Sequence, residues 1–405
     1  MRPAVLFIMI TVMIDAMGIG LIIPVMPDLI REVNGGGLSQ AALWGGMLAT
    51  SFAVMQFLFS PVLGGLSDRF GRRPVLLISL AVMAADYVVM ALAGSIWLLL
   101  AGRIIGGITA ATQATAAAYM ADISPPAERT RNFGLIGASF GAGFVLGPLI
   151  GGVLAEFGPR APFWAAAMLA AANVLFGWFI LKETLDPIRA RAFDWRRANP
   201  VGTLRQLGKL PGVRQLLFVY FLYHVAFAVY PSVWAYFGQA RFDWSPSMIG
   251  MSLGLFGVTM ALVQAFVIQH SINRLGEQRT VVIGHLFAVG TYCCIALISS
   301  GLVTLMLTPI AALAGIIPPA LQGIMSRRMA DNAQGELQGA LTSASSLAMI
   351  LSPLAMTASF AAFTRPDAAI YLPGAPFLLA AGLMVLAMVL FILRPTSADV
   401  ASQAT

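Results

Sequence analysis

The chain has 405 residues, of which 59% are hydrophobic and only 10% are charged. A soluble domain is roughly 45–50% apolar, so this composition excludes a soluble globular protein and indicates an integral membrane protein. The formal net charge of +7 does not indicate a nucleic-acid partner. The basic residues fall in short connectors between apolar runs, where membrane topology accounts for them.

The first apolar run covers residues 5–26. It is long, has Asp15 at its middle and lacks a small-residue cleavage site, so we interpret it as a retained helix rather than a secretory signal. A window of about 20 residues then finds eleven further spans. In chain order these cover residues 42–63, 74–93, 96–120, 131–154, 161–182, 212–236, 247–269, 278–299, 302–324, 337–361 and 372–394.

Three charges interrupt these apolar runs: Asp15, Asp86 and Arg103. A charge at the centre of a spanning helix costs about 3 kcal/mol on insertion scales, so such residues usually face an internal cavity and carry function. Two carboxylates near one arginine can hold different protonation states at pH 7. We predict that these three residues couple protons to transport. If a cationic or metal-chelated substrate and a proton compete for one carboxylate, binding of either one releases the other, which is antiport.

Three intramembrane amides, Gln56, Gln264 and Gln322, are the candidates for binding a polar ligand. His224, near the centre of the seventh span, is a further candidate. Hydrogen bonding between neighbouring helices is the alternative role for each amide, and it stays open at this stage.

The polar stretch 183–211, rich in arginine and proline, separates the sixth and seventh spans. We predict an N-terminal six-helix bundle at residues 1–182, a linker at 183–211 and a C-terminal six-helix bundle at 212–405. Nineteen of the 24 Lys and Arg residues fall on the side of the linker, four fall on the opposite side, and Arg103 lies within a span. The positive-inside rule therefore places both termini and the linker in the cytoplasm.

The two halves repeat each other at a constant offset. Arg274 follows Arg69 by 205 residues, and Gly276 follows Gly71 by the same number. Pro353 follows Pro148, also by 205 residues. The sequence thus predicts an all-α integral membrane protein of twelve helices in two pseudo-symmetric bundles, an arrangement in which secondary transporters hold their substrate between the repeats.

The connector Gly64-Gly65-Leu66-Ser67-Asp68-Arg69-Phe70-Gly71-Arg72-Arg73 resembles the signature loop of the major facilitator superfamily. The resemblance implies a conformational latch on the cytoplasmic side, in which Asp68 meets an arginine or a helix N-terminus in one conformer and releases it in the other. We assign to this latch Gly64, Asp68, Arg69, Gly71, Arg72, Arg73 and Asp122. The alternative is that these charges only anchor the topology.

Two further motifs resemble those of proton-driven members of that superfamily. Arg103-Ile104-Ile105-Gly106-Gly107 resembles the motif that places an arginine inside the cavity. The run from Gly143 to Gly152 is similar to the antiporter signature. Its small residues and proline allow close helix approach and a bend, and ordinary small-residue packing is the alternative explanation. The motif residues are Gly143, Gly147, Pro148, Gly151 and Gly152.

The resemblance is closest to tetracycline/proton antiporters of Gram-negative bacteria. It rests on the segments 14–27, Asp86-Tyr87, 137–141 and 319–323. It implies proton-coupled export of tetracycline, as a divalent-cation chelate, by alternating access in the bacterial inner membrane. We expect a functional monomer without a cofactor or catalytic residue, and Mg²⁺ or a similar cation only as part of the substrate, with no metal site formed by the protein alone.

The chain departs from that family in two helices. Ala288 stands where the antiporters carry an aspartate in the ninth helix, and the eighth-helix histidine is absent, since the region around Met260 is apolar. His285 lies on nearly the same face as Ala288 and is either a titratable substitute or a histidine bonded to a neighbouring helix. These departures keep a second function open, the proton-coupled export of another amphipathic drug or metabolite. The sequence does not indicate a membrane enzyme, because no nucleophile with an accompanying base is recognisable in it.

Overall fold

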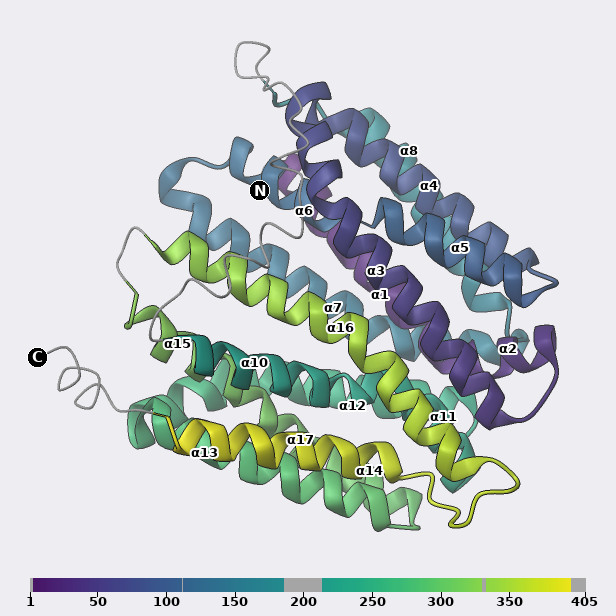
Figure 1. Ribbon diagram of the computed structural model, residues 1–405. Coiled ribbons are helices and arrows are strands. Elements are labelled where there is room, and N and C mark those ends of the chain that lie inside the picture. Colours follow the sequence, from purple (N-terminus) through teal and green to yellow (C-terminus); the bar gives the residue numbers. More distant parts are fainter. Residues whose placement is uncertain (1–2, 111, 186–212, 330–332, 395–405) are drawn as a thin grey trace, which may run out of the picture.

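The computed structural model describes residues 3–110, 112–185, 213–329 and 333–394. Over these residues every regular element is a helix, which confirms the all-α prediction, and Figure 1 shows two bundles. The predicted linker, 183–211, lies outside the described residues from 186 onward. The elements of the N-terminal bundle are α1 (Pro3–Ile22), η1 (Ile23–Val25), α2 (Met26–Asn34), α3 (Leu38–Phe70), α4 (Arg72–Leu92), α5 (Ile96–Thr109), α6 (Thr112–Ile123), η2 (Pro126–Glu128), α7 (Arg129–Leu154), η3 (Ala155–Phe157) and α8 (Ala161–Ile180).

The C-terminal bundle has the same kind of construction. Its elements are α10 (Arg214–Phe227), α11 (Val229–Phe242), α12 (Pro246–Leu262), the π-helical turn η5 (Val263–Val267), α13 (Ile268–Leu297), α14 (Gly301–Ala311), η6 (Ala312–Ile316), α15 (Ile317–Ser326), α16 (Gln334–Thr364) and α17 (Ala375–Ile392).

The number of continuous helices differs from the number of predicted spans. In the part of the chain that the structure describes, eleven helices are long and apolar enough to cross a membrane. The predicted eighth and ninth spans both fall within one 52-residue segment, Pro246–Leu297. A straight helix of that length would be about 80 Å long, more than twice the thickness of the hydrocarbon core. Gly276 inside the segment has φ 74° and ψ 162°, so the chain turns there.

The first and the seventh membrane helices are both interrupted. α1 passes through the 3₁₀ turn η1, which contains Pro24, before it continues as α2. α10 ends at Phe227, and α11 begins two residues later, after Ala228. Ala228 follows Ile23 by 205 residues, the offset that relates the two halves of the sequence. The interruption is therefore a feature of the repeated unit.

The two bundles meet along two pairs of helices, α3 with α16 and α7 with α12. Small residues form both contacts. A Cβ atom added to Gly46 on α3 would overlap the Thr357 hydroxyl on α16, and one added to Gly250 on α12 would overlap the Pro148 carbonyl on α7. Such residues let helices approach closely without hydrophobic side chains between them.

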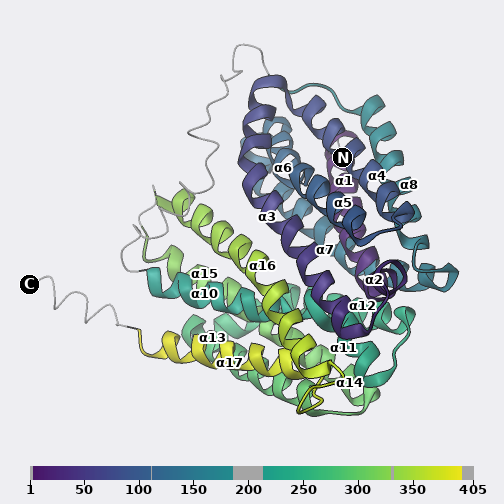
Figure 2. The same cartoon turned by 45° about the vertical axis from the view of Figure 1, so that its right-hand side comes forward.

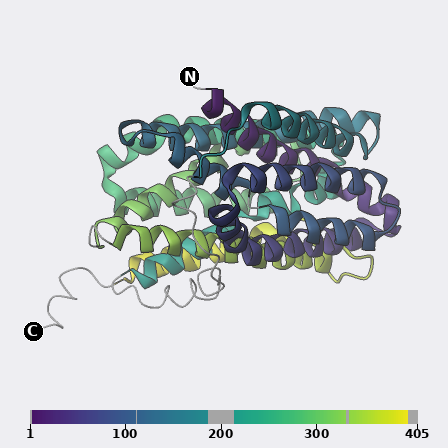
Figure 3. The same ribbon diagram turned by 90° about the horizontal axis from the view of Figure 1, so that it is seen from above.

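α3 and α16 converge toward one end of the molecule, which we call the contact end. There the Ser39 and Thr364 hydroxyl oxygens are 3.0 Å apart, and about three turns further along α3 the Thr50 hydroxyl donates to the Ile350 carbonyl at 3.1 Å. Toward the opposite end, the loop end that holds Gly71, the two helices diverge in Figures 1 and 2. Viewed from above in Figure 3, the helices of both bundles run roughly parallel.

The glycines of the predicted antiporter motif bring α7 against α1. Cβ atoms added to Gly143, Gly147 and Gly151 would overlap the carbonyl oxygens of Met13, Met17 and Leu21, so the two backbones are in direct contact over two turns. Gly152, one residue on, instead faces Pro246 and Gly250 of α12. The motif thus packs one helix of the C-terminal bundle as well as the helix that carries Asp15.

Substitution of these glycines tests this packing. We expect Gly143→Ala to lower the thermal stability of the detergent-solubilised protein by about 1–3 kcal/mol, because the added methyl group overlaps the Met13 carbonyl. Gly141→Ala, on the same helix with open space around its Cβ position, is the matched control and is expected to leave stability unchanged or slightly raised. Equal melting temperatures for the two variants would contradict the contact.

Candidate functional site

A buried ion pair joins α4 to α5 inside the N-terminal bundle. The Arg103 Nη2 atom donates to the Asp86 Oδ2 atom at 3.1 Å, and the two side chains are 10% and 2% exposed. The Arg103 guanidinium also lies over the Phe52 ring, 5.1 Å from its centre. Asp86 Oδ1 and Arg103 Nε are buried and have no hydrogen-bond partner in the described residues. The pair therefore keeps one free acceptor and one free donor within the membrane-spanning region.

Glycines on α5 make room for the Asp86 carboxylate. A Cβ atom on Gly102 would come within 2.7 Å of Asp86 Oδ1, and one on Gly106 within 2.6 Å of Oδ2. Gly107 faces α3, where a Cβ atom would lie 2.5 Å from the Phe52 carbonyl oxygen. The glycines that follow Arg103 in the sequence are thus needed for the close approach of the carboxylate and of α3.

Asp15 does not take part in this ion pair. Its side chain is partly buried on α1, and no hydrogen bond or ion pair of its carboxylate is found in the described residues. Tyr87, the residue after Asp86, is buried, and its hydroxyl packs against Gly18, one turn from Asp15. The structure therefore pairs two of the three charges that the sequence singled out, Asp86 and Arg103, and packs Tyr87 against the helix that carries Asp15.

The three predicted amides lie in different surroundings. Gln56 on α3 donates to the Ala110 carbonyl at 3.2 Å, at the end of α5, so it forms the helix-to-helix bond considered as its alternative role. Gln322 on α15 donates to the Tyr220 hydroxyl at 3.4 Å. Gln264 is exposed within η5, and π-helical turns are frequent at functional sites.

The two predicted histidines differ in exposure. His224 is partly exposed, and its ring makes edge contacts with Tyr220 and Tyr223, at centroid distances of 4.4 and 5.3 Å. His285 is fully buried within the C-terminal bundle, and its Nδ1 atom lies 2.8 Å from the Val281 carbonyl oxygen of its own helix. The Nε2 atoms of both histidines are buried without a partner in the described residues. Tyr220, His224 and Gln322 therefore form a polar cluster in the C-terminal bundle, and His285 bonds to the backbone of its own helix.

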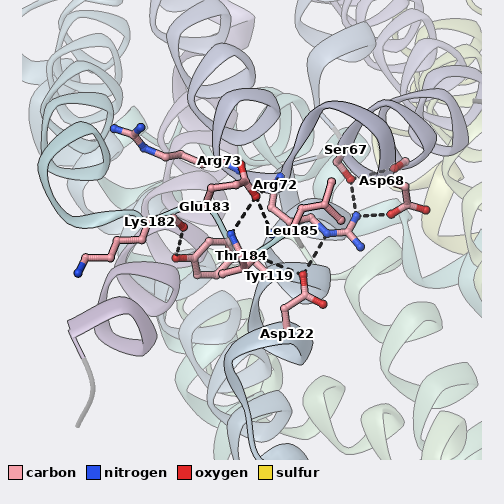
Figure 4. A network of polar contacts seen from close by, with 11 residues as sticks. Ser67, Asp68, Arg72, Arg73, Tyr119, Asp122, Lys182, Glu183, Thr184 and Leu185 are labelled. Atoms are coloured by element: carbon pink, nitrogen blue, oxygen red, sulfur yellow. Dashed lines mark hydrogen bonds and ion pairs between the residues drawn. The ribbon is translucent and has the colours of Figure 1, made fainter. Parts of the chain in front are cut away.

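Arg72 is the centre of the predicted latch (Figure 4). It forms ion pairs with Asp68, four residues earlier, and with Asp122 at the end of α6, where the Nε to Oδ2 distance is 3.3 Å. It also donates to the Ser67 hydroxyl at 2.6 Å. Asp68 therefore meets an arginine of its own loop in this conformer.

The N-terminus of α4 is capped by Glu183, which sequence reasoning missed. Its carboxylate accepts the backbone N–H groups of Arg72 and Arg73 at 3.0 and 3.2 Å, where the helix dipole favours negative charge. Gly71, at φ 106°, leaves space for the carboxylate, because a Cβ atom there would overlap it (Figure 4). The bonds span about 110 residues of sequence, so no local pattern indicates them.

Of the remaining latch residues, Arg73 contacts α8, and Arg69 and Gly64 contact neighbours in the sequence. Arg73 donates to the Trp178 carbonyl at 2.9 Å and lies over the Trp178 ring. Arg69 lies over the ring of Phe70, and the Gly64 carbonyl accepts the Ser67 hydroxyl at 2.8 Å. These contacts hold the loop between α3 and α4 against the end of α8.

The C-terminal bundle repeats the interhelical ion pair with its charges exchanged. Glu277, at the turn that follows Gly276, forms an ion pair with Arg327 after α15. These residues follow Arg72 and Asp122 by 205 positions each, so a cation–anion pair in one half corresponds to an anion–cation pair in the other. The constant offset is the sequence signal that would have found this pair.

The comparisons with known proteins agree with this architecture. The model of the Major Facilitator Superfamily matches residues 8–353 and 216–404. The chain belongs to the major facilitator superfamily. This transporter is 44% identical over 350 residues to the class C tetracycline resistance protein of Escherichia coli, covering 86% of this chain and 88% of that protein.

Two solved structures share its fold. The human organic anion transporter MFSD10 is 26% identical, with a TM-score of 0.70, and the match covers 96% of this chain and 99% of that one. A bacterial homologue of the human lysosomal transporter Spinster, in an inward-facing and unoccupied conformation, has a TM-score of 0.78 at 16% identity, and the match covers 96% of each chain.

The Asp86–Arg103 pair can be tested through stability. Arg103→Met leaves the Asp86 carboxylate buried without a counter-ion, and we expect a loss of about 3–5 kcal/mol. Adding Asp86→Asn removes the unpaired charge and is expected to recover most of that loss, as measured by thermal unfolding in detergent. A double variant no more stable than Arg103→Met alone would show that the pair is not what the substitution disturbs.

The exchanged ion pair of the C-terminal bundle makes a second test. Glu277→Arg places two guanidinium groups together and is expected to lower the free energy of unfolding by about 1 kcal/mol, since Arg327 is largely exposed. Combining it with Arg327→Glu restores the attraction with the charge order of the N-terminal bundle. A double-mutant cycle without coupling energy would contradict the pairing.

Proposed function

We propose that this transporter exports tetracycline, chelated to a divalent cation such as Mg²⁺, from the cytoplasm in exchange for protons. The observation that carries the proposal is the buried Asp86–Arg103 pair, in a chain 44% identical to a tetracycline resistance protein and with a second intramembrane carboxylate, Asp15, that has no partner in the described residues. The cation belongs to the substrate and not to the protein.

The coupling follows from competition at the carboxylates. Arg103 gives Asp86 a counter-ion, whereas Asp15 has none among the described residues. A carboxylate without a counter-ion in an apolar surrounding binds either a proton or a cationic ligand, and binding of one releases the other. Alternating access then turns this competition into antiport, because the two ligands are exchanged on opposite sides of the membrane.

The two bundles carry different chemistry at equivalent positions, which supports a division of roles. At the offset of 205 residues, Tyr220 takes the place of Asp15 and Thr291 that of Asp86. The C-terminal bundle thus has neutral hydrogen-bonding groups where the N-terminal bundle has acids. We assign proton binding to the N-terminal bundle and contacts with the polar face of the drug to Gln322, Tyr220 and His224.

The contacts between the bundles suggest the state of the transporter. The bonds at Ser39 and Thr50 lie toward the contact end, while the latch lies at the loop end. With the arginine-rich loops in the cytoplasm, as the positive-inside rule requires, the contact end is periplasmic. We propose that this is the inward-facing state of a functional monomer with both termini in the cytoplasm.

The membrane potential supplies enough energy for useful export when each cycle moves one net positive charge inward. Moving one charge through a potential of about 150 mV releases roughly 3.5 kcal/mol, which corresponds to a gradient of several hundredfold. An exchange ratio in which the entering protons carry at least one more positive charge than the exported drug complex meets this condition.

Energised inverted membrane vesicles test the proposal. Adding tetracycline with Mg²⁺ is expected to reduce the acidity of the vesicle interior in a dose-dependent way, as reported by recovery of a quenched ΔpH-sensitive dye. Asp15→Asn and Asp86→Asn are expected to abolish this response. Asp367→Asn, an exposed carboxylate at the contact end, is the matched control and should respond like the parent.

Failure at confirmed expression has a clear meaning. Vesicles that show no response to tetracycline and cells with unchanged susceptibility would exclude tetracycline export. Full activity in both aspartate variants would exclude the site.

A second candidate function is proton-coupled export of another amphipathic drug or metabolite. It is favoured by the ninth helix, where Ala288 is fully buried and offers no carboxylate. The same vesicles tested with a panel of lipophilic cations separate the two candidates, since only the second predicts a response to such a cation without a response to tetracycline.

A further inference from the structure

α11 makes two contacts with the N-terminal bundle at the contact end. Tyr236 and Gln239 are one turn apart and lie on the same face of the helix. Tyr236 contacts α3, and Gln239 contacts α2. The two contacts differ in their hydrogen bonding. The Tyr236 hydroxyl has no partner in the described residues, whereas both the oxygen and the nitrogen of the Gln239 amide have one.

The Gln239 amide bridges two unlike charges. Its Nε2 atom donates to Asp28 Oδ2 at 3.1 Å, and its Oε1 atom accepts from Arg31 Nη2 at 3.2 Å. Asp28 and Arg31 also form an ion pair with each other along α2. A neutral amide fits this position because it presents a donor to the anion and an acceptor to the cation.

The Tyr236 hydroxyl lacks such partners. The side chain is 4% exposed, its hydroxyl packs against the backbone of α3 at Gly45, and no hydrogen-bond partner for it is present in the described residues. A hydroxyl that leaves water without gaining a bond disfavours the contact that buries it. When α11 and α3 separate, this hydroxyl regains hydration.

The segments that carry these contacts follow interruptions in their helices. α2 follows η1, and α11 follows the break at Ala228, two points that correspond in the repeat. Helix interruptions of this kind let the outer segment change its angle relative to the inner one. Two of the three elements in this contact, α2 and α11, therefore follow a helix interruption.

We propose that Gln239 is a positioning residue that holds the contact end shut, and that Tyr236 opposes it and makes the contact reversible. The balance between the bridged amide and the unpartnered hydroxyl sets how much of the protein occupies the shut state. The inference concerns the transport cycle itself and does not depend on which drug is carried.

A disulfide reporter measures the shut state directly. Ser39→Cys and Thr364→Cys replace hydroxyls 3.0 Å apart across the two bundles, in a background with Cys293→Ser and Cys294→Ser. The ratio of disulfide to dithiol in glutathione buffer then reports how often the two positions meet, without any substrate. Gln239→Ala in this background is expected to lower the ratio about fivefold, the effect of losing the two hydrogen bonds.

Further variants show whether Gln239 and Tyr236 each favour or disfavour the shut state. Adding Tyr236→Phe to Gln239→Ala is expected to raise the ratio again, because the unpartnered hydroxyl is removed while the ring stays. The pair Asp28→Asn with Gln239→Glu exchanges the amide and the carboxylate and is expected to keep the ratio near that of the reporter alone. Arg241→Ala is the matched control on the same helix, because its bonds to the Leu297 and Ile298 carbonyls stay inside the C-terminal bundle.

The outcomes decide the proposal. A ratio for Gln239→Ala equal to that for Arg241→Ala, at equal thermal stability, would overturn the role of Gln239. A fall in the ratio when Tyr236→Phe is added would overturn the role of Tyr236. Because no drug enters the measurement, neither result depends on the outcome of the tetracycline experiment.

Discussion

The cost of charge in a hydrocarbon environment organises the N-terminal bundle. Asp86 on α4 pairs with Arg103 on α5, and Gly102 and Gly106 leave space for the carboxylate. A buried pair of this kind contributes little net stability, because desolvation offsets most of the attraction. Its presence therefore points to function rather than to folding, and so does Asp15, an intramembrane carboxylate without a partner in the described residues.

The repeat keeps geometry and changes chemistry. Gly71 and Gly276 both have a positive φ, and Pro148 and Pro353 both lie inside helices that line the interface between the bundles. At other equivalent positions the charges are exchanged or lost. The backbone geometry fixes the residue type at only a few positions, such as these glycines and prolines, whereas a binding side chain must suit its ligand. Two copies of one fold can therefore diverge into a proton-binding half and a drug-binding half, as proposed above.

Small residues and polar bonds have complementary roles between the bundles. Glycines on α3, α7 and α12 let backbones touch, which gives contact area without the interlocking of large side chains. Few hydrogen bonds then suffice to bias the bundles toward one arrangement. A transporter needs this combination, because its interface has to form and separate in every cycle.

The sequence by itself determined the class, the helical content, the repeat, and the three intramembrane charges. Each of these depends on composition or on spacing along the chain, and the bilayer makes both decisive, since it demands long apolar helices and tolerates charge only for a reason. The antiporter glycines were likewise visible as a motif, although the sequence did not say which helix each one contacts.

Only the tertiary structure decided which partners those residues have. It paired Arg103 with Asp86, placed Glu183 on the N-terminus of α4, and bonded Gln322 to Tyr220. These contacts join residues that are distant in sequence, and they depend on the rotation of each helix about its own axis. That rotation is set by packing against all neighbours at once, so no local pattern of residues encodes it.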